Sequence, residues 1–372
     1  MKIFIFSSVH PWNDTRVFYK ETVSLAKNGY RVKLCAIENN VKYDGMYENL
    51  QVDYLPKVRR LTRPFLWLRL FIKALREKAD VYHFHDPELL LIGYLLKVFT
   101  KSKVIYDMHE DFPAAIKSKP WIPKKIRRRL SRIIAYVEKV LIKKCDAVIF
   151  AEKYYKENYT DINITKEDIL NYPLNNNQLD SMKKYETPTV VYAGGISKIR
   201  GFFEMLKAAK SLNDRGQIFN MVIIGNINEE LKNEAIAYIK ENNLSKIVQL
   251  PGRLPLSEVY SYYNKSHVGL AILHPEENYL RSLATKIFEY MSVSIPVVAS
   301  NFPEWKELIE NEQCGEVVDP YNIEQIADKI EFLLKENDYA LQLGLNGFNA
   351  YTQKYNWEVE ENKLYNLYNQ LI

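Results

Sequence analysis

Short apolar runs alternate with longer amphipathic stretches along this chain. In the first half, the runs that we interpret as strands are Lys2–Ser8, Arg31–Ile37, Val81–His85, Val104–Asp107 and Ala147–Phe150. Residues Thr15–Lys27 have the spacing of an amphipathic helix, which Asn28 and Gly29 close. Alternating strands and helices predict a parallel sheet with helices on both faces.

The same pattern starts again in the second half. The predicted strands are Thr189–Ala193, Met221–Ile224, Ile247–Leu250, Val268–Leu273 and Pro296–Ala299, with helices such as Phe202–Leu212 and Glu229–Glu241 between them. The polar segment 171–187 is a predicted linker, and Trp357–Leu371 is a predicted terminal helix. The pattern therefore predicts two doubly wound α/β domains, 1–175 and 186–352, and a C-terminal helical segment, 353–372.

Composition agrees with a globular protein of more than one domain. The chain has 372 residues, of which 47% are apolar and 26% charged. No apolar run reaches the ~18 residues of a membrane-spanning helix, and the N-terminus lacks a signal-peptide pattern. The three cysteines, Cys35, Cys145 and Cys314, lie far apart, which argues against a disulfide framework or a zinc site. We therefore expect a cytoplasmic protein.

Charge is distributed unevenly. Residues 1–186 hold 34 Lys and Arg against 22 Asp and Glu, a net +12, whereas residues 187–372 hold 17 against 24, a net −7. Segments 58–79 and 117–144 interleave basic residues with Trp, Phe, Leu and Ile, as membrane-surface helices do. The alternative is a core-facing stripe with solvated charges. No nucleic-acid partner is expected, because no DNA- or RNA-binding motif accompanies the charge.

Polar residues follow the predicted strands of the first half. The loop 7–16 holds His10, Asp14 and Arg16, where backbone amides at a helix start and the arginine could bind an anion. A plain capped turn is the alternative. No G-x-G-x-x-G follows this strand, so the main signal of a nicotinamide or flavin site is missing.

Three histidines follow later strands. His83 and His85 share one face of a strand, and with Asp86 they are possible metal ligands. We favour a hydrogen-bonding role for His83, and no nearby residue completes a metal site. His109, after the next strand, is either a polar group of a ligand site or a structural histidine.

Glycine turns and basic residues follow the strands of the second half. Such turns let the backbone approach a ligand, and basic side chains beside them could neutralise phosphates. The candidate residues at three turns are Gly194, Gly195, Lys198, Arg200, Gly225 and Arg253. An exposed basic turn is the alternative interpretation for Lys198 and Arg200.

The segment 274–291 carries the clearest site pattern. A helix predicted to begin near Ser282 would present free amides to a diphosphate. Glu289, two turns further on, could accept two vicinal hydroxyls; a surface residue is the alternative.

In their order along the chain, these segments resemble a family 4 glycosyltransferase of the GT-B fold, in its bacterial surface-polysaccharide branch. The resemblance rests on His-Pro-x-x-Asp-Thr-Arg at 10–16, Tyr-His-Phe-His-Asp-Pro at 82–87, Asp-x-His-Glu at 107–110, Gly-Gly-x-Ser-x-x-Arg-Gly at 194–201 and Thr-Lys-x-Phe-Glu-Tyr-Met at 285–291. It implies two Rossmann-like domains that face each other across a cleft. The terminal helix would pack back on the first domain.

The family's site residues transfer by position. His109 matches the histidine that contacts the transferred sugar, Arg200 the residue that binds the donor diphosphate, and Glu289 the acid that holds the ribose. The helix-terminus phosphate site matches Leu283, Ala284 and Thr285, with Lys286 beside it. The chain departs from the family pattern at Arg281, where an acid is usual, and at Gly195, where an arginine is common.

The resemblance implies a retaining, metal-independent transfer from a nucleotide sugar, with UDP favoured, to a lipid-linked glycan in cell-surface polysaccharide synthesis. The nucleotide sugar is a substrate, and no cofactor is expected. The enzyme would associate peripherally with the inner face of the membrane. Two alternatives remain: a UDP-sugar 2-epimerase of related fold, and a catalytically degenerate scaffold subunit, which the departures at Gly195 and Arg281 suggest.

Overall fold

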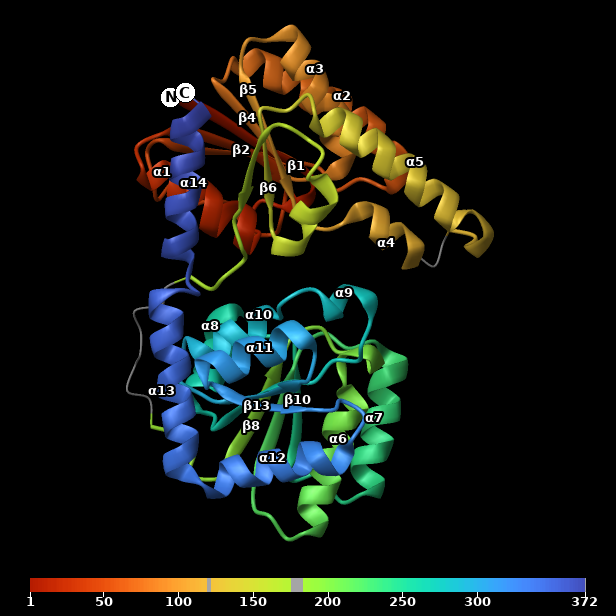
Figure 1. The fold of residues 1–372 in the computed structure, drawn as a ribbon, viewed down its shortest axis with the longest axis vertical. Helices are drawn as coiled ribbons and strands as arrows, with labels where there is room; N and C mark the ends of the chain where they lie inside the picture. The colour runs from red at the N-terminus through yellow and green to blue at the C-terminus, as the bar shows by residue number, and fades with distance from the viewer. Residues whose placement is uncertain (119–121, 175–182, 372) are drawn as a thin grey trace. The chain divides into compact units, whose positions relative to one another are not determined.

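The chain folds into two compact units, which a computed structural model describes over residues 1–118, 122–174 and 183–371 (Figure 1). The first unit consists of Met1–Asn171 and Trp357–Ile372, and the second of Tyr172–Asn356. The chain leaves the first unit at 171–172 and returns at 356–357, whereas the sequence pattern predicts boundaries at 175, 186 and 353. Residues 175–182 of the predicted linker, including the boundary at 175, lie outside the described residues.

A seven-stranded parallel sheet forms the centre of the first unit. Its strands are β1 (Lys2–Pro11), β2 (Arg31–Ile37), β3 (Leu50–Leu55), β4 (Val81–Phe84), β5 (Lys103–Met108), β6 (Ala147–Phe150) and β7 (Thr165–Asp168). They lie in the order β3-β2-β1-β4-β5-β6-β7. Every residue of β4 and β6 is buried, as expected for central strands with helices on both faces.

Helices cover both faces of this sheet. They are a π-helix (Thr15–Thr22), α1 (Val23–Lys27), α2 (Arg63–Glu77), α3 (Leu90–Phe99), α4 (Phe112–Ser118), α5 (Lys124–Ile142) and α14 (Trp357–Leu371), with 3₁₀ turns at Arg60–Thr62, Pro87–Leu89 and Lys153–Tyr159. Tyr82 and Phe84 of β4 pack with Leu70 of α2 on one face. His83 points to the other face, where its Nδ1 lies 2.9 Å from the Tyr368 hydroxyl of α14. In Figure 1, α14 runs beside α1.

A six-stranded parallel sheet forms the centre of the second unit. Its strands are β8 (Thr189–Ala193), β9 (Asn220–Ile224), β10 (Val248–Gly252), β11 (Val268–Ala271), β12 (Val297–Ser300) and β13 (Gly315–Val318). Their order is β10-β9-β8-β11-β12-β13, so the strand order reverses between β8 and β11.

The helices of the second unit are α6 (Phe202–Asp214), α7 (Glu229–Glu241), α8 (Leu256–Lys265), α9 (Glu277–Leu280), α10 (Thr285–Met291), α11 (Pro303–Glu312), α12 (Ile323–Lys335) and α13 (Asn337–Gln353), with a 3₁₀ turn at Lys198–Arg200. Apolar residues of α6, α7 and α12 form one core with Tyr192 and Ile223. On the other face, the Tyr290 ring of α10 packs on Gly269, where a Cβ would come within 2.5 Å of the ring. The glycine thus permits close helix–sheet packing.

The two doubly wound parallel α/β domains predicted from the sequence are confirmed. The pattern misses β3, β7 and β13, and each is an edge strand of its sheet. Edge strands are only partly buried, so polar residues such as Asp53, Lys166 and Glu316 interrupt their apolar runs.

Two predicted helices differ in detail from the structure. The predicted helix Thr15–Lys27 has the predicted bounds but consists of the π-helix followed by the short α1. The helix predicted near Ser282 begins at Thr285, after a non-helical Ala284. Among the described residues, no helix is both long and apolar enough to span a bilayer.

Candidate active site

Side chains from three neighbouring strand ends converge in the first unit. The strand order reverses between β1 and β4, and β5 lies next to β4. His10 belongs to the end of β1, His85 follows β4 and His109 follows β5. The His109 ring packs against the rings of His10 and His85, with centroid distances of 4.8 and 5.0 Å. These predicted residues therefore meet at a topological switch point, where α/β sheets bind ligands.

A cavity of about 620 Å³ opens beside these rings. Its lining residues are Val9, His10, Arg60, Arg63, Trp67, His85, Asp86, Pro87, Glu88, His109, Glu110 and Phe112. Glu88 accepts hydrogen bonds from Arg63 Nη1 at 2.8 Å and from Trp67 Nε1 at 3.1 Å. Carboxylates beside aromatic rings are suited to a ligand rich in hydroxyl groups.

The loop after β1 is capped by its own carboxylate. Asp14 Oδ1 accepts hydrogen bonds from the backbone N–H groups of Arg16 and Val17, at 2.9 and 3.0 Å. These two amides are already hydrogen-bonded to Asp14, so they are not available to an anion, contrary to the prediction of an anion-binding loop. Burial alone would lower the pKa of His10, but Asp14 and Asp86, at 3.4 and 3.7 Å, raise it.

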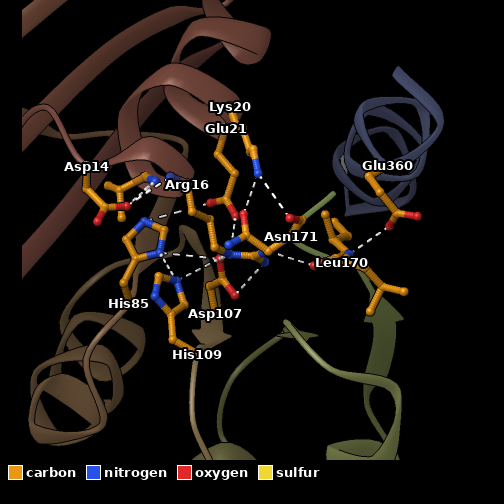
Figure 2. Close-up of polar contacts among 12 residues, drawn as sticks. Asp14, Arg16, Lys20, Glu21, His85, Asp107, His109, Leu170, Asn171 and Glu360 are labelled. Carbon is orange, nitrogen blue, oxygen red and sulfur yellow. Dashed lines mark hydrogen bonds and ion pairs between the residues drawn. The ribbon is translucent and has the colours of Figure 1, made fainter. Parts of the chain in front are cut away.

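Arg16 lies in a buried network of charged residues (Figure 2). Its Nε and Nη2 donate to Asp107 Oδ2 and Oδ1 at 3.2 and 3.0 Å, and Nη1 donates to the Ile169 carbonyl at 2.8 Å. Its Nε also lies 2.9 Å from Glu21 Oε1. The prediction that Arg16 is available to an anion in the loop is therefore wrong, because its guanidinium is buried against Asp107 and Glu21. Burial and the nearby Asp107 raise the pKa of Glu21 well above its usual value, so Asp107 is the carboxylate that Arg16 neutralises.

Four residues of this network have side chains of the kinds that bind metal ions. Glu21, His83, His85 and Asp107 are buried, and their ligand atoms lie within 4.8 Å of one another. Burial holds the pKa of both histidines low, to about 4 for His85. Arg16, however, already places a positive charge against both carboxylates. These residues fit an arginine-neutralised cluster better than a cation site.

A second cavity, of about 430 Å³, lies at the strand ends of the second unit. Its lining residues are Ala193, Gly194, Gly195, Arg200, Ile224, Gly225, Asn226, Arg253, Leu254, Leu256, Val259, Tyr263, Thr285, Lys286 and Glu289. The turns after β8, β9 and β10 lie side by side, since Gly194 N donates to Ile224 O and Gly225 N to Gly252 O, both at 2.9 Å. This cavity is also at a switch point, between β8 and β11.

Lys286 and Arg200 bring positive charge to this cavity. A Cβ at Gly194 would lie 2.6 Å from Lys286 Nζ, and a Cβ at Gly195 would lie 3.4 Å from Arg200 Nη1. The two glycines therefore leave room for the two basic side chains. Burial lowers the pKa of Lys286 to about 8, an effect that Glu289 opposes and Arg200 strengthens.

Glu289 is oriented by a tyrosine. Tyr263 Oη donates to Glu289 Oε2 at 3.0 Å. Burial and the nearby Glu289 carboxylate raise the pKa of Tyr263 well above its usual value, so the phenol stays a donor. One carboxylate oxygen of Glu289 is thus held in place at the cavity wall.

Three predicted donor residues lie elsewhere. Lys198 pairs with Glu234 at 2.8 Å and lines a different cavity, between α6 and α7. Leu283 and Ala284 precede the first turn of α10 and do not line the cavity of the second unit. The family resemblance assigns them to the end of a helix, but that helix begins three residues after the predicted start near Ser282.

Sequence reasoning missed other site residues. Asp107 and Glu21 lie in a buried strand and a buried helical turn, where a pattern search expects no charge. Tyr263 reads as one more aromatic residue of an amphipathic helix. What sets Tyr263 apart from the other aromatic residues of α8 is its hydrogen bond to Glu289, which the sequence alone does not indicate.

Solved structures identify the fold. The chain resembles sucrose-phosphate synthase of Thermosynechococcus elongatus with a TM-score of 0.75 at 17% identity, over 100% of this chain and 98% of that one. It resembles Anabaena HepE, solved in complex with UDP-glucose, with a TM-score of 0.73 at 14% identity over the whole of both chains. The fold is that of the GT-B glycosyltransferases.

Family models then identify the family. A model described as glycosyl transferases group 1 matches residues 176–350, and a model described as glycosyltransferase family 4 matches residues 15–170. Together they span most of the chain, which belongs to this glycosyltransferase family. The resemblance stated from the motifs is confirmed.

Curated relatives agree with this membership. An uncharacterized glycosyltransferase of Haemophilus influenzae is 25% identical over 340 residues, 88% of each chain. The capsular polysaccharide biosynthesis glycosyltransferase CapM of Staphylococcus aureus is 22% identical over 206 residues, 54% of this chain and 52% of that one.

Proposed function

We propose that this glycosyltransferase uses a nucleotide sugar, with UDP as the favoured nucleotide, and binds it in the cavity of the second unit. The observation that carries the proposal is the convergence of Arg200, Lys286 and Glu289 on glycine turns at the switch point. The basic side chains are suited to a diphosphate, and the oriented carboxylate to the two ribose hydroxyls. The UDP-glucose complex of the similarly folded HepE supports the choice of UDP.

We propose that the transfer is retaining and needs no metal. Arg200 and the buried Lys286 would stabilise the negative charge that develops on the leaving diphosphate, which is the task a divalent cation performs in other enzymes. His109 would face the transferred sugar. Product analysis by NMR should give the same anomeric configuration as the donor, and EDTA should leave turnover unchanged.

We propose that the acceptor is a lipid-linked glycan and that the cavity of the first unit binds it. Glu88 and Trp67, side chains of the kinds that bind sugars, line this cavity together with arginines at the start of α2. On the same segment, Leu61 and Phe65 are 93% and 77% exposed. The acceptor's lipid would meet this apolar stripe. The relationship to a capsular polysaccharide glycosyltransferase supports a role in surface polysaccharide synthesis.

We propose peripheral binding to an anionic membrane, at the inner face of the cell membrane, through segments 58–79 and 117–144. The helices α2 and α5 both contact α3, and all three carry exposed apolar side chains. These are Leu61, Phe65, Leu68, Ile72, Leu91, Val98, Phe99, Ile126, Ile133, Tyr136, Val137 and Val140. Such a surface next to many basic residues is typical of interfacial binding. Residues 119–121 of the second segment lie outside the described chain.

A nucleotide panel tests the donor assignment. Thermal unfolding is recorded with UDP, GDP, ADP and CMP in parallel. A nucleotide at ~100 times its dissociation constant stabilises by about 2.7 kcal/mol, which should raise the midpoint by roughly 5–11 °C, because each kcal/mol shifts a unit of this size by about 2–4 °C. We expect this with UDP. No shift with any nucleotide would favour the scaffold alternative, and a C2-epimerised sugar formed from the donor alone would favour the epimerase.

A further inference from the structure

Asp107 is a buried carboxylate that faces the His109 ring from within the sheet. It lies in β5, two residues before His109, and has no exposed surface. Its Oδ2 lies 3.4 Å from His109 Nε2 and 3.3 Å from His85 Nδ1, and these two ring nitrogens are 3.1 Å apart. One edge of the His109 ring is therefore committed to the protein interior, and the ring also lines the cavity.

Arg16 fixes this carboxylate on its opposite side. The guanidinium donates to both Asp107 oxygens and, through Nη1, to the Ile169 carbonyl, so neither partner can rotate without breaking several hydrogen bonds (Figure 2). Burial alone would raise the pKa of Asp107, but Arg16 and His109 hold it well below its usual value. Asp107 is thus ionised, and an ionised carboxylate only accepts hydrogen bonds.

We propose that Asp107, locked by Arg16, is the positioning residue that fixes the ring orientation and the tautomer of His109. A ring nitrogen facing a carboxylate is favoured in its protonated, donating form. His109 would then carry its proton on Nε2 and present the lone pair of Nδ1 to the cavity as an acceptor for a substrate hydroxyl. The proposed tautomer is argued from the contacts of His109 with Asp107 and His85 and needs no ligand. Its consequence for turnover rests on the proposed role of His109 toward the sugar.

His83 provides a matched control. It is as buried as Asp107, and its Nε2 lies 3.9 Å from the same carboxylate. Its Nδ1 contacts Tyr368 of α14, and it does not line the cavity. A change at His83 therefore perturbs the buried network without touching the His109 ring.

Nitrogen NMR of the full chain labelled at histidine tests the tautomer. The chain has six histidines, and His109→Gln assigns the signal of interest. We expect the Nε2-protonated form of His109 in the wild type and in His83→Gln, and a mixture of tautomers or the Nδ1-protonated form in Asp107→Asn. An unchanged tautomer in Asp107→Asn, or the Nδ1 form in the wild type, would overturn the proposal. If Asp107→Asn does not fold, the tautomer of the wild type decides alone, because the Nδ1-protonated form of His109 in the wild type would still overturn the proposal.

A double-mutant cycle on the hydrolysis of UDP-glucose, in which water accepts the glucosyl group and UDP is released, tests the consequence for turnover. We expect Asp107→Asn alone to lower turnover by roughly 10- to 100-fold, as loss of an orienting partner does, and to have almost no further effect in a His109→Ala background. A purely structural role would give equal losses in both backgrounds. Absence of turnover in the wild type would count against the proposed donor and leave the NMR result standing.

Discussion

The buried ammonium of Lys286 indicates that the ligand of the second unit's cavity is negatively charged. Its side chain is only 9% exposed, and Nζ lies 5.0 Å from the centre of the Tyr192 ring. Burial lowers its pKa to about 8, so the ammonium is held at a cost to stability. A diphosphate in the cavity would supply the missing counter-charge, and protonated Lys286 would in turn bind it.

This arrangement predicts opposite pH trends for stability and nucleotide binding. Between about pH 8 and 10.5 the unfolded state binds more protons at Lys286 than the folded state does, so the free energy of unfolding should rise with pH. Over the same range UDP affinity should fall as the folded lysine loses its charge. Urea unfolding and UDP titration at pH 7, 8, 9 and 10 measure both trends.

The comparison variant for this experiment is Lys286→Met. This variant should lose the contribution of Lys286 to both trends. Lys184, a partly buried lysine whose pKa burial also lowers to about 8, remains in both proteins. Equal pH trends in the wild type and in Lys286→Met would contradict the assignment.

At the residue scale, sequence reasoning works for polar side chains next to a turn or a helix start. Arg200 follows a glycine turn, Lys286 and Glu289 lie in the short helix α10, and the structure brings all three to one cavity. Sequence reasoning fails for Arg16, because a charge that looks exposed in a loop is buried against Asp107, which lies 91 residues away in sequence. Long-range pairing of this kind leaves no local signal.

At the element scale, the strand-end turns of β8 and β9 depend on glycine. Gly225 has a positive φ of 159°, and a Cβ there would lie 1.8 Å from the Gly194 carbonyl oxygen. Gly225→Ala should therefore push the two turns apart, lower stability by roughly 2 kcal/mol or more, and weaken UDP binding at least tenfold.

Gly216→Ala is the control for this variant. Gly216 also has a positive φ, but nothing lies within 4 Å of its Cβ position. It should cost only about 1–2 kcal/mol and leave UDP affinity unchanged. Urea unfolding measures the stability of both variants, and calorimetric titration measures their affinity for UDP. Equal UDP affinity in Gly225→Ala and Gly216→Ala would contradict the account.

The helix α2 presents two apolar faces, and only one of them is buried. Leu66 and Leu70 pack into the core, whereas Phe65 and Leu68 are exposed, as is Leu61 in the 3₁₀ turn just before α2. Replacing these three exposed residues by serine should weaken co-sedimentation with phosphatidylglycerol vesicles at least tenfold, because apolar burial in the bilayer is lost. The midpoint of thermal unfolding should change little.

The matched control replaces three exposed apolar residues of the second unit, Ile218, Leu341 and Leu345, by serine. This variant should bind vesicles like the wild type. An equal loss in both triple variants, or no loss in either, would refute a specific membrane face on α2.

Sequence patterns identify α2 as amphipathic and basic, yet they do not show which apolar side chains face water. They also overlook α3 as part of this surface. With a single charged residue, Lys97, α3 resembles a core helix, although Leu91, Val98 and Phe99 are exposed. Exposure depends on which neighbours pack against a helix, and only the fold supplies them.

At the scale of the whole molecule, the restart of the strand–helix pattern is enough to predict two domains. Each unit has its own buried core. The predicted linker 171–187 and the predicted terminal helix Trp357–Leu371 begin where the chain passes between the units, but the predicted domain bounds at 175 and 353 miss these passages. The bound at 175 is too late because Ile169, Leu170 and Asn171 are tied to the first unit by long-range hydrogen bonds. Among these, Leu170 N donates to Glu360 Oε2 at 2.8 Å.

Separate cores predict separate responses to mutation. Leu364 of α14 is fully buried in the first unit, so Leu364→Ala should destabilise that unit by about 2–5 kcal/mol. UDP affinity, which depends on the second unit, should be unchanged. Calorimetric unfolding with and without UDP measures both; a weakened UDP response in Leu364→Ala would contradict the assignment of nucleotide binding to the second unit.

The central claim is that the second unit binds a nucleotide through Glu289 and the basic residues beside it. Isothermal titration of the full chain with UDP tests it most directly, using the wild type, Glu289→Gln and the exposed control Glu307→Gln. We predict one site per chain in the wild type and in Glu307→Gln, and affinity at least tenfold weaker in Glu289→Gln, because a charged hydrogen-bond acceptor contributes about 1.5–3 kcal/mol. No binding of UDP to the wild type, or equal affinity in all three proteins, would contradict the account.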